Sequence, residues 1–424
     1  MLRAVLGLTT RGRCLLAAGL AAALCAWALN ERELLRVAAF VITLPLLAVV
    51  LLAVTQVRIH AQRKPFPQRV PAGAECAVRI DLWRSGRLPA GQTIITDGVP
   101  YGLGARPRFV VQRLPHDRSV PLSYPLRPVL RGVHHIGTLH ATIADPFGLC
   151  EVDRPLLGPS RITVIPATVE LAGLPFGGSL GIDDRGTAGR VAGIGDPDAV
   201  VRQYRHGDDL RRVHWPSTAR RDELMVRLEE RPRHGSTTIM LDHRAAAHAG
   251  TGTTASLEWA VSFVASACLR LRRGGHGVRL VNHLATPLAE LPSHGTSEHE
   301  DLLLDALAEV RASHEREITT GHDPAGGGAL IAVLGGVGEA AAERLCRHRR
   351  PGAAGFAVLL DTPSWAADGT GDGADGDAPA LNAAQQFQAA GWDTCVVTPG
   401  TDMHQVWTRI CTSTPRAPVT GGSP

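Results

Sequence analysis

Residues 195–230 read G-D-P-D-A-V-V-R-Q-Y-R-H-G-D-D-L-R-R-V-H-W-P-S-T-A-R-R-D-E-L-M-V-R-L-E-E, the densest grouping of turn, charge and aromatic signals in this chain of 424 residues. The H-G-D-D run at 206–209 predicts a turn in which glycine takes a positive φ and an aspartate caps the segment after it. Residues 210–215 are then expected to form one or two helical turns, which Pro216 ends. Apolar residues at alternate positions from 224 to 228 predict a strand.

The charge of this stretch is balanced. Residues 202–230 hold seven arginines and six acidic residues, which favours internal ion pairs over a site for a phosphate backbone. The whole chain carries a net charge of only +4, whereas a nucleic-acid-binding domain concentrates a basic face, so we expect no nucleic-acid partner. Lys64 is the single lysine, and the soluble part therefore offers none for a Walker-type nucleotide site or a lysine imine.

Two apolar segments near the N-terminus, residues 14–29 and 37–57, predict a transmembrane helical hairpin within residues 1–64. The second carries no formal charge, and at about 1.5 Å per residue it is long enough for a hydrocarbon core of roughly 30 Å. Basic residues flank both outer ends of the hairpin, whereas the short loop between the segments mixes charges. We therefore expect a multi-pass protein of the cell membrane whose soluble domains face the cytoplasm. Eight widely spaced cysteines without a C-x-x-C pair fit a reducing compartment.

Residues 65–170 predict a small β-sandwich, because short alternating runs are separated by glycine and proline. The expected strands lie at 77–83, 108–111, 137–143 and 161–165. The D-P-F-G-L run at 145–149 has the composition of a tight turn, and we expect Phe147 to be buried at its corner.

Residues 236–412 predict an α/β domain with an open, mostly parallel sheet and helices on both faces. Its strands are expected at 237–241, 278–281, 330–334, 356–360 and 394–397. Residues 171–235 are expected to form a connector that carries the opening stretch, and residues 413–424 a disordered tail. The predicted fold class is thus α+β multidomain, with a membrane hairpin, a small β-sandwich and an α/β domain.

These features together resemble the domain of unknown function 58 family, bacterial membrane-anchored proteins whose α/β part is similar to a von Willebrand factor A domain, a Rossmann-like fold. The resemblance is carried by residues 202–220, the strand through Val226, D-P-F-G-L at 145–149 and V-I-P at 164–166, and it covers about residues 70–411. It implies a partner-binding or structural role for a set of motif residues, namely Tyr204, Gly207, Asp208, Asp209, Arg211, His214, Trp215, Ala219 and Arg220.

The resemblance also implies partners. Such proteins are often encoded beside MoxR-type AAA+ ATPases and transglutaminase-like membrane proteins. The expected function is therefore that of a non-enzymatic interaction or scaffold protein, anchored in the lipid bilayer, that works with such an ATPase in envelope or protein-complex assembly. No cofactor is expected.

The von Willebrand factor A metal site places Asp-x-Ser-x-Ser after the first strand, because a carboxylate and two hydroxyl oxygens suit Mg²⁺. Here the run reads D-H-R-A-A from Asp242 to Ala246. Arginine and alanine replace both hydroxyls, and a guanidinium repels a divalent ion, so Asp242 is expected to mark a degenerate metal site without a metal. Asp242 and Asp361 still follow predicted strands, where open α/β sheets bind ligands.

A metal-dependent hydrolase is the alternative function, with its centre at His206, Asp208, Asp209 and His214. A structural turn explains the same four residues, and the sequence contains no H-E-x-x-H or C-x-x-C motif. The sequence therefore favours a protein that is not an enzyme.

Overall fold

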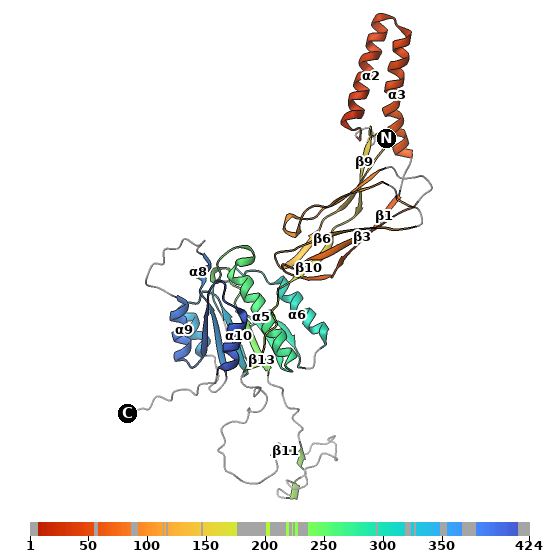
Figure 1. Ribbon diagram of the computed structural model, residues 1–424. Coiled ribbons are helices and arrows are strands. Elements are labelled where there is room, and N and C mark those ends of the chain that lie inside the picture. The colour runs from red at the N-terminus through yellow and green to blue at the C-terminus, as the bar shows by residue number, and fades with distance from the viewer. Residues whose placement is uncertain are drawn as a thin grey trace. The chain divides into compact units, whose positions relative to one another are not determined.

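The computed structural model describes residues 7–54, 58–85, 92–112, 114–115, 118–145, 147–175, 201–203, 218–219, 223, 225–227, 236–293, 296–318, 324–325, 328–347, 354–366 and 379–413. The chain divides into two compact units, residues 1–167 with 307–310, and residues 168–306 with 311–424 (Figure 1). Most of the expected connector and nearly all of the expected tail lie outside the described residues.

The first unit begins with two antiparallel helices, α2 (Thr10–Leu29) and α3 (Arg32–Val54). Both are long and apolar enough to cross a membrane. Gly12, Gly19 and Ala26 are the buried residues of α2, and their seven-residue spacing places small side chains on one stripe. A Cβ atom on Gly19 would lie 2.7 Å from Cγ1 of Ile42, so the absence of a side chain allows the close approach of α3 that is typical of membrane helix pairs.

Three small sheets follow in the first unit, with strand orders β1-β3-β6, β2-β10-β7 and β5-β4-β8-β9. The strands are β1 (Arg58–Phe66), β2 (Arg69–Pro71), β3 (Cys76–Ser85), β4 (Thr93–Asp97), β5 (Arg108–Val111), β6 (Val120–Leu126), β7 (Gly132–Ile136), β8 (Leu139–Ala144), β9 (Glu151–Leu157) and β10 (Ser160–Ile165), with a 3₁₀ turn η1 (Tyr101–Leu103). The four strands expected from alternating sequence are confirmed within two residues at each end.

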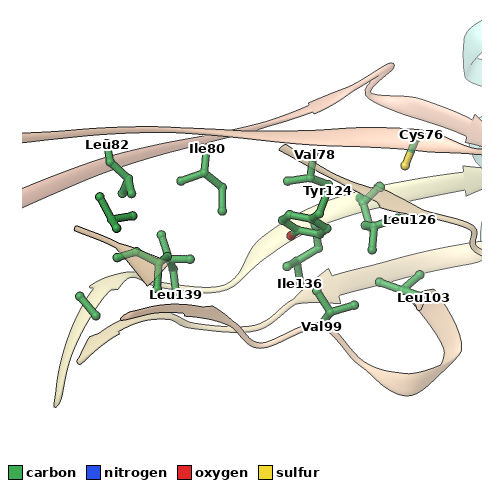
Figure 2. Packing of buried hydrophobic residues seen from close by; sticks show 14 of the residues in the cluster. Cys76, Val78, Ile80, Leu82, Val99, Leu103, Tyr124, Leu126, Ile136 and Leu139 are labelled. Carbon is green, nitrogen blue, oxygen red and sulfur yellow. The ribbon is translucent and has the colours of Figure 1, made fainter. Parts of the chain in front are cut away.

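Alternate residues of these strands share one apolar core (Figure 2). Val78, Ile80 and Leu82 of β3 are fully buried, and their neighbours on the other side of the strand are more exposed. Tyr124 projects into the same core, where its hydroxyl donates a 2.6 Å hydrogen bond to Oδ2 of buried Asp97. Arg63 pairs with the other oxygen of Asp97. A buried charge is tolerated here because it is paired and hydrogen-bonded.

The D-P-F-G-L turn differs from the sequence prediction. Phe147 is 61% exposed, whereas Asp145 is buried at 6% exposure. The carboxylate of Asp145 accepts hydrogen bonds from the backbone N–H groups of Phe147 and Cys150, at 2.9 and 2.6 Å. The prediction of a buried phenylalanine was therefore wrong, because the aspartate and not the aromatic ring holds the turn together.

The second unit contains a six-stranded sheet of order β15-β14-β13-β16-β17-β18. Its strands are β13 (Ser236–Leu241), β14 (Gly277–Asn282), β15 (Pro287–Leu291), β16 (Ala329–Leu334), β17 (Gly355–Leu360) and β18 (Asp393–Val397). All neighbouring pairs are parallel except β14 and β15. The five expected strands of an open, mostly parallel sheet are confirmed, and the antiparallel edge strand β15 is an addition to the prediction.

The helices of this unit are α5 (Ser256–Arg273), α6 (Ser297–Glu309), α7 (Glu339–Arg347), α8 (Thr362–Ala366), α9 (Pro379–Ala389) and α10 (Met403–Thr412). Helices α7 and α9 share a core with one set of alternating strand residues, among them Met240, Ala332 and Ala357. Helices α5 and α10 lie side by side, because Arg270 of the first and Trp407 of the second both donate to the carbonyl of Gly173. The short strands β11 (Val201–Gln203) and β12 (Met225–Arg227) pair antiparallel, which confirms a strand near 224–228.

Candidate functional site

The best-defined polar site of the second unit lies where β13 ends, at the carboxyl edge of the sheet. Asp242 follows β13 directly and is fully buried at 0% exposure. Strand order reverses here, because β14 lies on one side of β13 and β16 on the other. Open α/β sheets bind ligands at such a switch point, so the position is the one expected for a functional site.

The guanidinium of Arg244 forms a bidentate ion pair with the carboxylate of Asp242. Its Nε lies 2.9 Å from Oδ1 and its Nη2 lies 2.7 Å from Oδ2. Two backbone N–H groups also donate hydrogen bonds to the carboxylate, that of Arg244 to Oδ1 at 3.1 Å and that of Gly335 to Oδ2 at 3.3 Å. The guanidinium is itself held by the carbonyls of Arg316 and Gly336. N–H donors therefore already occupy both oxygens through which this carboxylate would coordinate a cation.

The electrostatics follow from this geometry. Burial by itself raises the pKa of Asp242, but the hydrogen bonds and positive charge of Arg244 outweigh burial, and the pKa lies below its ordinary value. The carboxylate is thus ionised at neutral pH and is neutralised by a group that cannot lose its proton. Within the described ranges, no group of three or more histidine, cysteine, aspartate or glutamate side chains is placed to hold a metal ion.

His248 connects this ion pair to the start of α5. Its Nε2 lies 2.8 Å from the carbonyl oxygen of Asp242 and its Nδ1 lies 3.0 Å from Oγ of Ser256. A carbonyl only accepts, so Nε2 carries the proton, and Nδ1 of the neutral ring accepts from the serine hydroxyl. Burial lowers the pKa of His248, which keeps the ring neutral. Serine, histidine and aspartate are neighbours here, but the histidine touches the aspartate carbonyl and Ser256 is fully buried, so the three do not form a nucleophilic triad.

A pair of histidines also lies beside the ion pair, at the ends of β13 and β14. The rings of His243 and His283 meet edge to face with centroids 4.8 Å apart. Nδ1 of His243 donates to the carbonyl of Arg311 at 2.9 Å. Among the described residues, its Nε2 and both ring nitrogens of His283 have no hydrogen-bond partner, although His283 is only 1% exposed. Burial and the neighbouring imidazole lower the pKa of His283.

Gly335 and Gly336 close the site from β16. A Cβ atom on Gly335 would lie 2.0 Å from the carbonyl oxygen of Ala247, and the N–H of Gly336 donates to the same oxygen at 2.7 Å. The 3₁₀ turn η4 (Ala245–Ala247) therefore packs directly on the end of β16. Ala246, at the second serine position of the Asp-x-Ser-x-Ser pattern, lies in this turn.

Asp361, the other aspartate expected at this edge, follows β17, and its backbone carbonyl accepts from the backbone and hydroxyl of Ser364. The structure does not bring Asp361 into the Asp242 cluster. A separate hollow of about 360 Å³ lies between the start of α7 and α9, and it is lined by Val337, Gly338, Glu339, Pro363, Pro379, Asn382, Ala383 and Gln386.

Eight of the nine predicted motif residues, Tyr204, Gly207, Asp208, Asp209, Arg211, His214, Trp215 and Arg220, lie outside the described residues, as does His206 of the alternative hydrolase centre. Ala219 is described, in a helical turn and exposed. The predicted arrangement of the motif thus stays a prediction. Sequence reasoning singled out Asp242 but missed His248 and Ser256, whose sequence separation from Asp242 carries no recognisable motif.

Comparison with known proteins supports one family. Residues 200–344 match the family model described as "Protein of unknown function DUF58". An uncharacterized protein YeaD of Bacillus subtilis is 26% identical over 195 residues, which cover 43% of this chain and 47% of that protein. An uncharacterized protein Rv1480 of Mycobacterium tuberculosis is 27% identical over 161 residues, which cover 37% of this chain and 48% of that protein. The chain therefore spans about half the length of the curated relatives it matches.

Solved structures match about a quarter of this chain. The match to the CARDB domain of the PF1109 protein from Pyrococcus furiosus covers 26% of this chain and 88% of that structure's chain, with a TM-score of 0.19 at 13% identity. The match to the immunoglobulin-like protein PA1606 of Pseudomonas aeruginosa covers 26% of this chain and 97% of that structure's chain, with a TM-score of 0.18 at 15% identity.

Proposed function

We propose that this chain is a membrane-anchored, non-enzymatic interaction protein of the domain of unknown function 58 family. The observation that carries the proposal is the ion pair between Asp242 and Arg244. In a von Willebrand factor A-like domain the corresponding aspartate lies in the ligand-binding edge and recruits a cation. In this proposal the guanidinium of Arg244 takes the place of that cation, and the edge binds its partner without a metal.

The two apolar helices α2 and α3 supply the anchor. In this proposal they form a hairpin in the cell membrane, and the basic residues at its outer ends place the soluble units on the cytoplasmic side. The partners are a MoxR-type AAA+ ATPase and a transglutaminase-like membrane protein, as the family resemblance implies. Family motif residues 204–220 contribute to the docking of the ATPase or hold the surface that does.

Copurification tests the proposal. Full-length chain purified in mild detergent is mixed with a purified MoxR-type AAA+ ATPase, and the complex is isolated through a tag on the chain. We expect a stoichiometric complex that Asp208→Ala and Arg211→Ala weaken and that Glu343→Ala, at an exposed position of α7, leaves intact. An ATPase that fails to bind the wild-type chain contradicts the proposed partner.

The same preparation distinguishes the hydrolase alternative. A bound metal in equimolar amount, together with hydrolytic activity that Asp208→Ala abolishes, would establish that function in place of an interaction role. Metal analysis of the purified chain before and after treatment with a chelator provides the readout.

A further inference from the structure

The turn at residues 145–150 lies against the base of the helical hairpin. The backbone N–H of Thr9, the residue that caps α2, donates to the carbonyl of Leu149 at 2.9 Å, and its hydroxyl donates to the carbonyl of Gly148 at 2.8 Å. Leu8 forms a β-bridge with Cys150, and the N–H of Glu151 donates to the carbonyl of Gly7 at 2.8 Å. The turn is therefore bonded through its backbone to the residues that start the first helix.

Packing strengthens the same junction. Ala48, Val49 and Leu52 of α3 form a buried cluster with Leu149 and other residues of the turn's neighbourhood, namely Ile143 and Cys150. A Cβ atom on Gly12 would lie 2.2 Å from the carbonyl oxygen of Leu149. Backbone of the turn thus reaches the helix surface, and the hairpin is docked on the β strands and not merely joined to them by a linker.

The depth of the turn relative to a bilayer follows from the helix. Leu15 packs against the cluster that contains Leu149, and at about 1.5 Å per residue it lies about 8 Å along α2 from Thr10. Arg11 and Arg13 of the first helical turn are exposed, as expected for side chains at the level of the lipid head groups. The turn therefore reaches the level between the head groups and the start of the acyl chains.

Phe147 is 61% exposed at the tip of this turn. The carboxylate of Asp145 accepts hydrogen bonds from two backbone N–H groups of the turn, so the turn is held without any packing of the Phe147 ring. A large apolar side chain in water is unfavourable, whereas at the boundary of head groups and acyl chains the same ring is removed from water.

We propose that the 145–150 turn is a membrane-contact loop that inserts Phe147 into the head-group region of the bilayer beside the hairpin. The ligand is the lipid surface itself. This inference rests on the proposed membrane anchoring of α2 and α3. Its consequence is that the β strands of the first unit contact the bilayer through this loop, in addition to their covalent connection to the hairpin.

Photocrosslinking to lipid tests the inference in the full-length chain. The photoreactive residue p-benzoylphenylalanine replaces Phe147, Phe66 or Leu24, one at a time, and each protein is reconstituted in vesicles of phosphatidylethanolamine and phosphatidylglycerol that contain a taggable lipid. Phe66 is the matched control, because it is also an exposed phenylalanine, at 77%, in the same unit. Phe66 pairs with Ala77 at one end of β3, whereas Arg58, on the side of α3, pairs with Ser85 at the other end. At about 3.3 Å per residue, Phe66 therefore lies about 26 Å from the end of β1 that is nearest to the hairpin.

Leu24, 68% exposed on α2, reports on the anchoring itself. We expect lipid adducts at positions 24 and 147 and about tenfold fewer at position 66, since only a side chain removed from water meets acyl chains. Adducts at 24 without adducts at 147 overturn the loop contact and leave the anchoring intact, whereas no adducts at 24 overturn both. Equal labelling at 66 and 147, or a protein adduct in place of lipid at 147, also overturns the inference. Equal melting temperatures of the three proteins verify that each is folded.

Discussion

The guanidinium of Arg244 lies across the carboxylate of Asp242, with Nε 2.9 Å from one oxygen and Nη2 2.7 Å from the other. Two residues separated by a single histidine thus neutralise each other at the end of β13, in the interior of the second unit. The ion pair explains why a buried carboxylate is stable at the edge of this sheet, and it is the feature on which the first predictions rest.

Removal of the arginine side chain by Arg244→Ala is expected to lower the free energy of unfolding of the second unit by about 3–5 kcal/mol, because the carboxylate remains buried without its counter-charge. Urea unfolding of the full-length chain, followed by tryptophan fluorescence, measures the loss. Arg347→Ala removes an exposed ion pair with Glu343 and is the control, with an expected cost below about 1 kcal/mol. Equal losses in the two variants contradict the structural role of the Arg244 pair.

Restoring the hydroxyls of the Asp-x-Ser-x-Ser pattern provides a second prediction. The double variant Arg244→Ser with Ala246→Ser removes the internal cation and supplies two oxygen ligands near Asp242. We expect the melting temperature of this variant to rise with Mg²⁺ concentration, as binding to the folded state requires, while that of the wild-type chain does not. A wild-type protein that Mg²⁺ stabilises to the same degree contradicts the view that Arg244 takes the place of a metal.

The histidines near Asp242 predict a pH dependence of stability. The pKa values of His248 and His283 are lowered in the folded state, chiefly by burial, from an ordinary value near 6.5. The unfolded chain therefore binds more protons, so the stabilisation by neutral imidazoles is present above about pH 6.5 and is lost as the pH falls toward the folded-state pKa values. We expect the melting temperature to decrease between pH 7.5 and 5.5.

His283→Leu is the variant that tests this pH dependence, because it removes a buried ring without hydrogen-bond partners among the described residues. It should make the loss of stability toward acid shallower. His404→Asn, at an exposed position of α10, should leave the slope unchanged. A slope that is the same in all three proteins contradicts the assignment to His283.

The two glycines at the end of β16 predict a steric effect. Gly335→Ala places a methyl group 2.0 Å from the carbonyl oxygen of Ala247, so the backbone of η4 or of β16 must move, and we expect a loss of about 2–4 kcal/mol. Gly338→Ala meets nothing within 4 Å and is the control, with an expected change of less than about 1 kcal/mol. Differential scanning calorimetry compares the two, and a harmless Gly335→Ala contradicts the close approach.

The base of the hairpin predicts a comparable effect in the first unit. Gly12→Val forces a side chain into the carbonyl of Leu149 and should separate α2 from the 145–150 turn, whereas Ala18→Val, on an exposed position of the same helix, should not. Limited proteolysis of the detergent-solubilised chain near residue 147 measures the separation. We expect faster cleavage in Gly12→Val, and equal cleavage in both variants contradicts the docking.

Much of the fold was readable from the sequence, because its signals are local. Charge-free apolar length predicted α2 and α3, and period-two alternation predicted β3 and β10 close to their observed bounds. The antiparallel strand β15 was missed because Pro287–Leu291 is short and weakly patterned. Phe147 was placed wrongly because composition shows that a turn forms but not which of its side chains satisfies the backbone.

The amino-acid sequence was enough to predict the order of most elements, the absence of both hydroxyls after β13 and the presence of an arginine two residues from Asp242. The three-dimensional fold was needed to show that this arginine turns back onto the carboxylate, that His248 and Ser256 lie beside it, and that the 145–150 turn meets the start of α2. The physical reason is that burial and hydrogen bonding depend on which distant segments share a space, whereas hydrophobic periodicity depends only on neighbours along the chain.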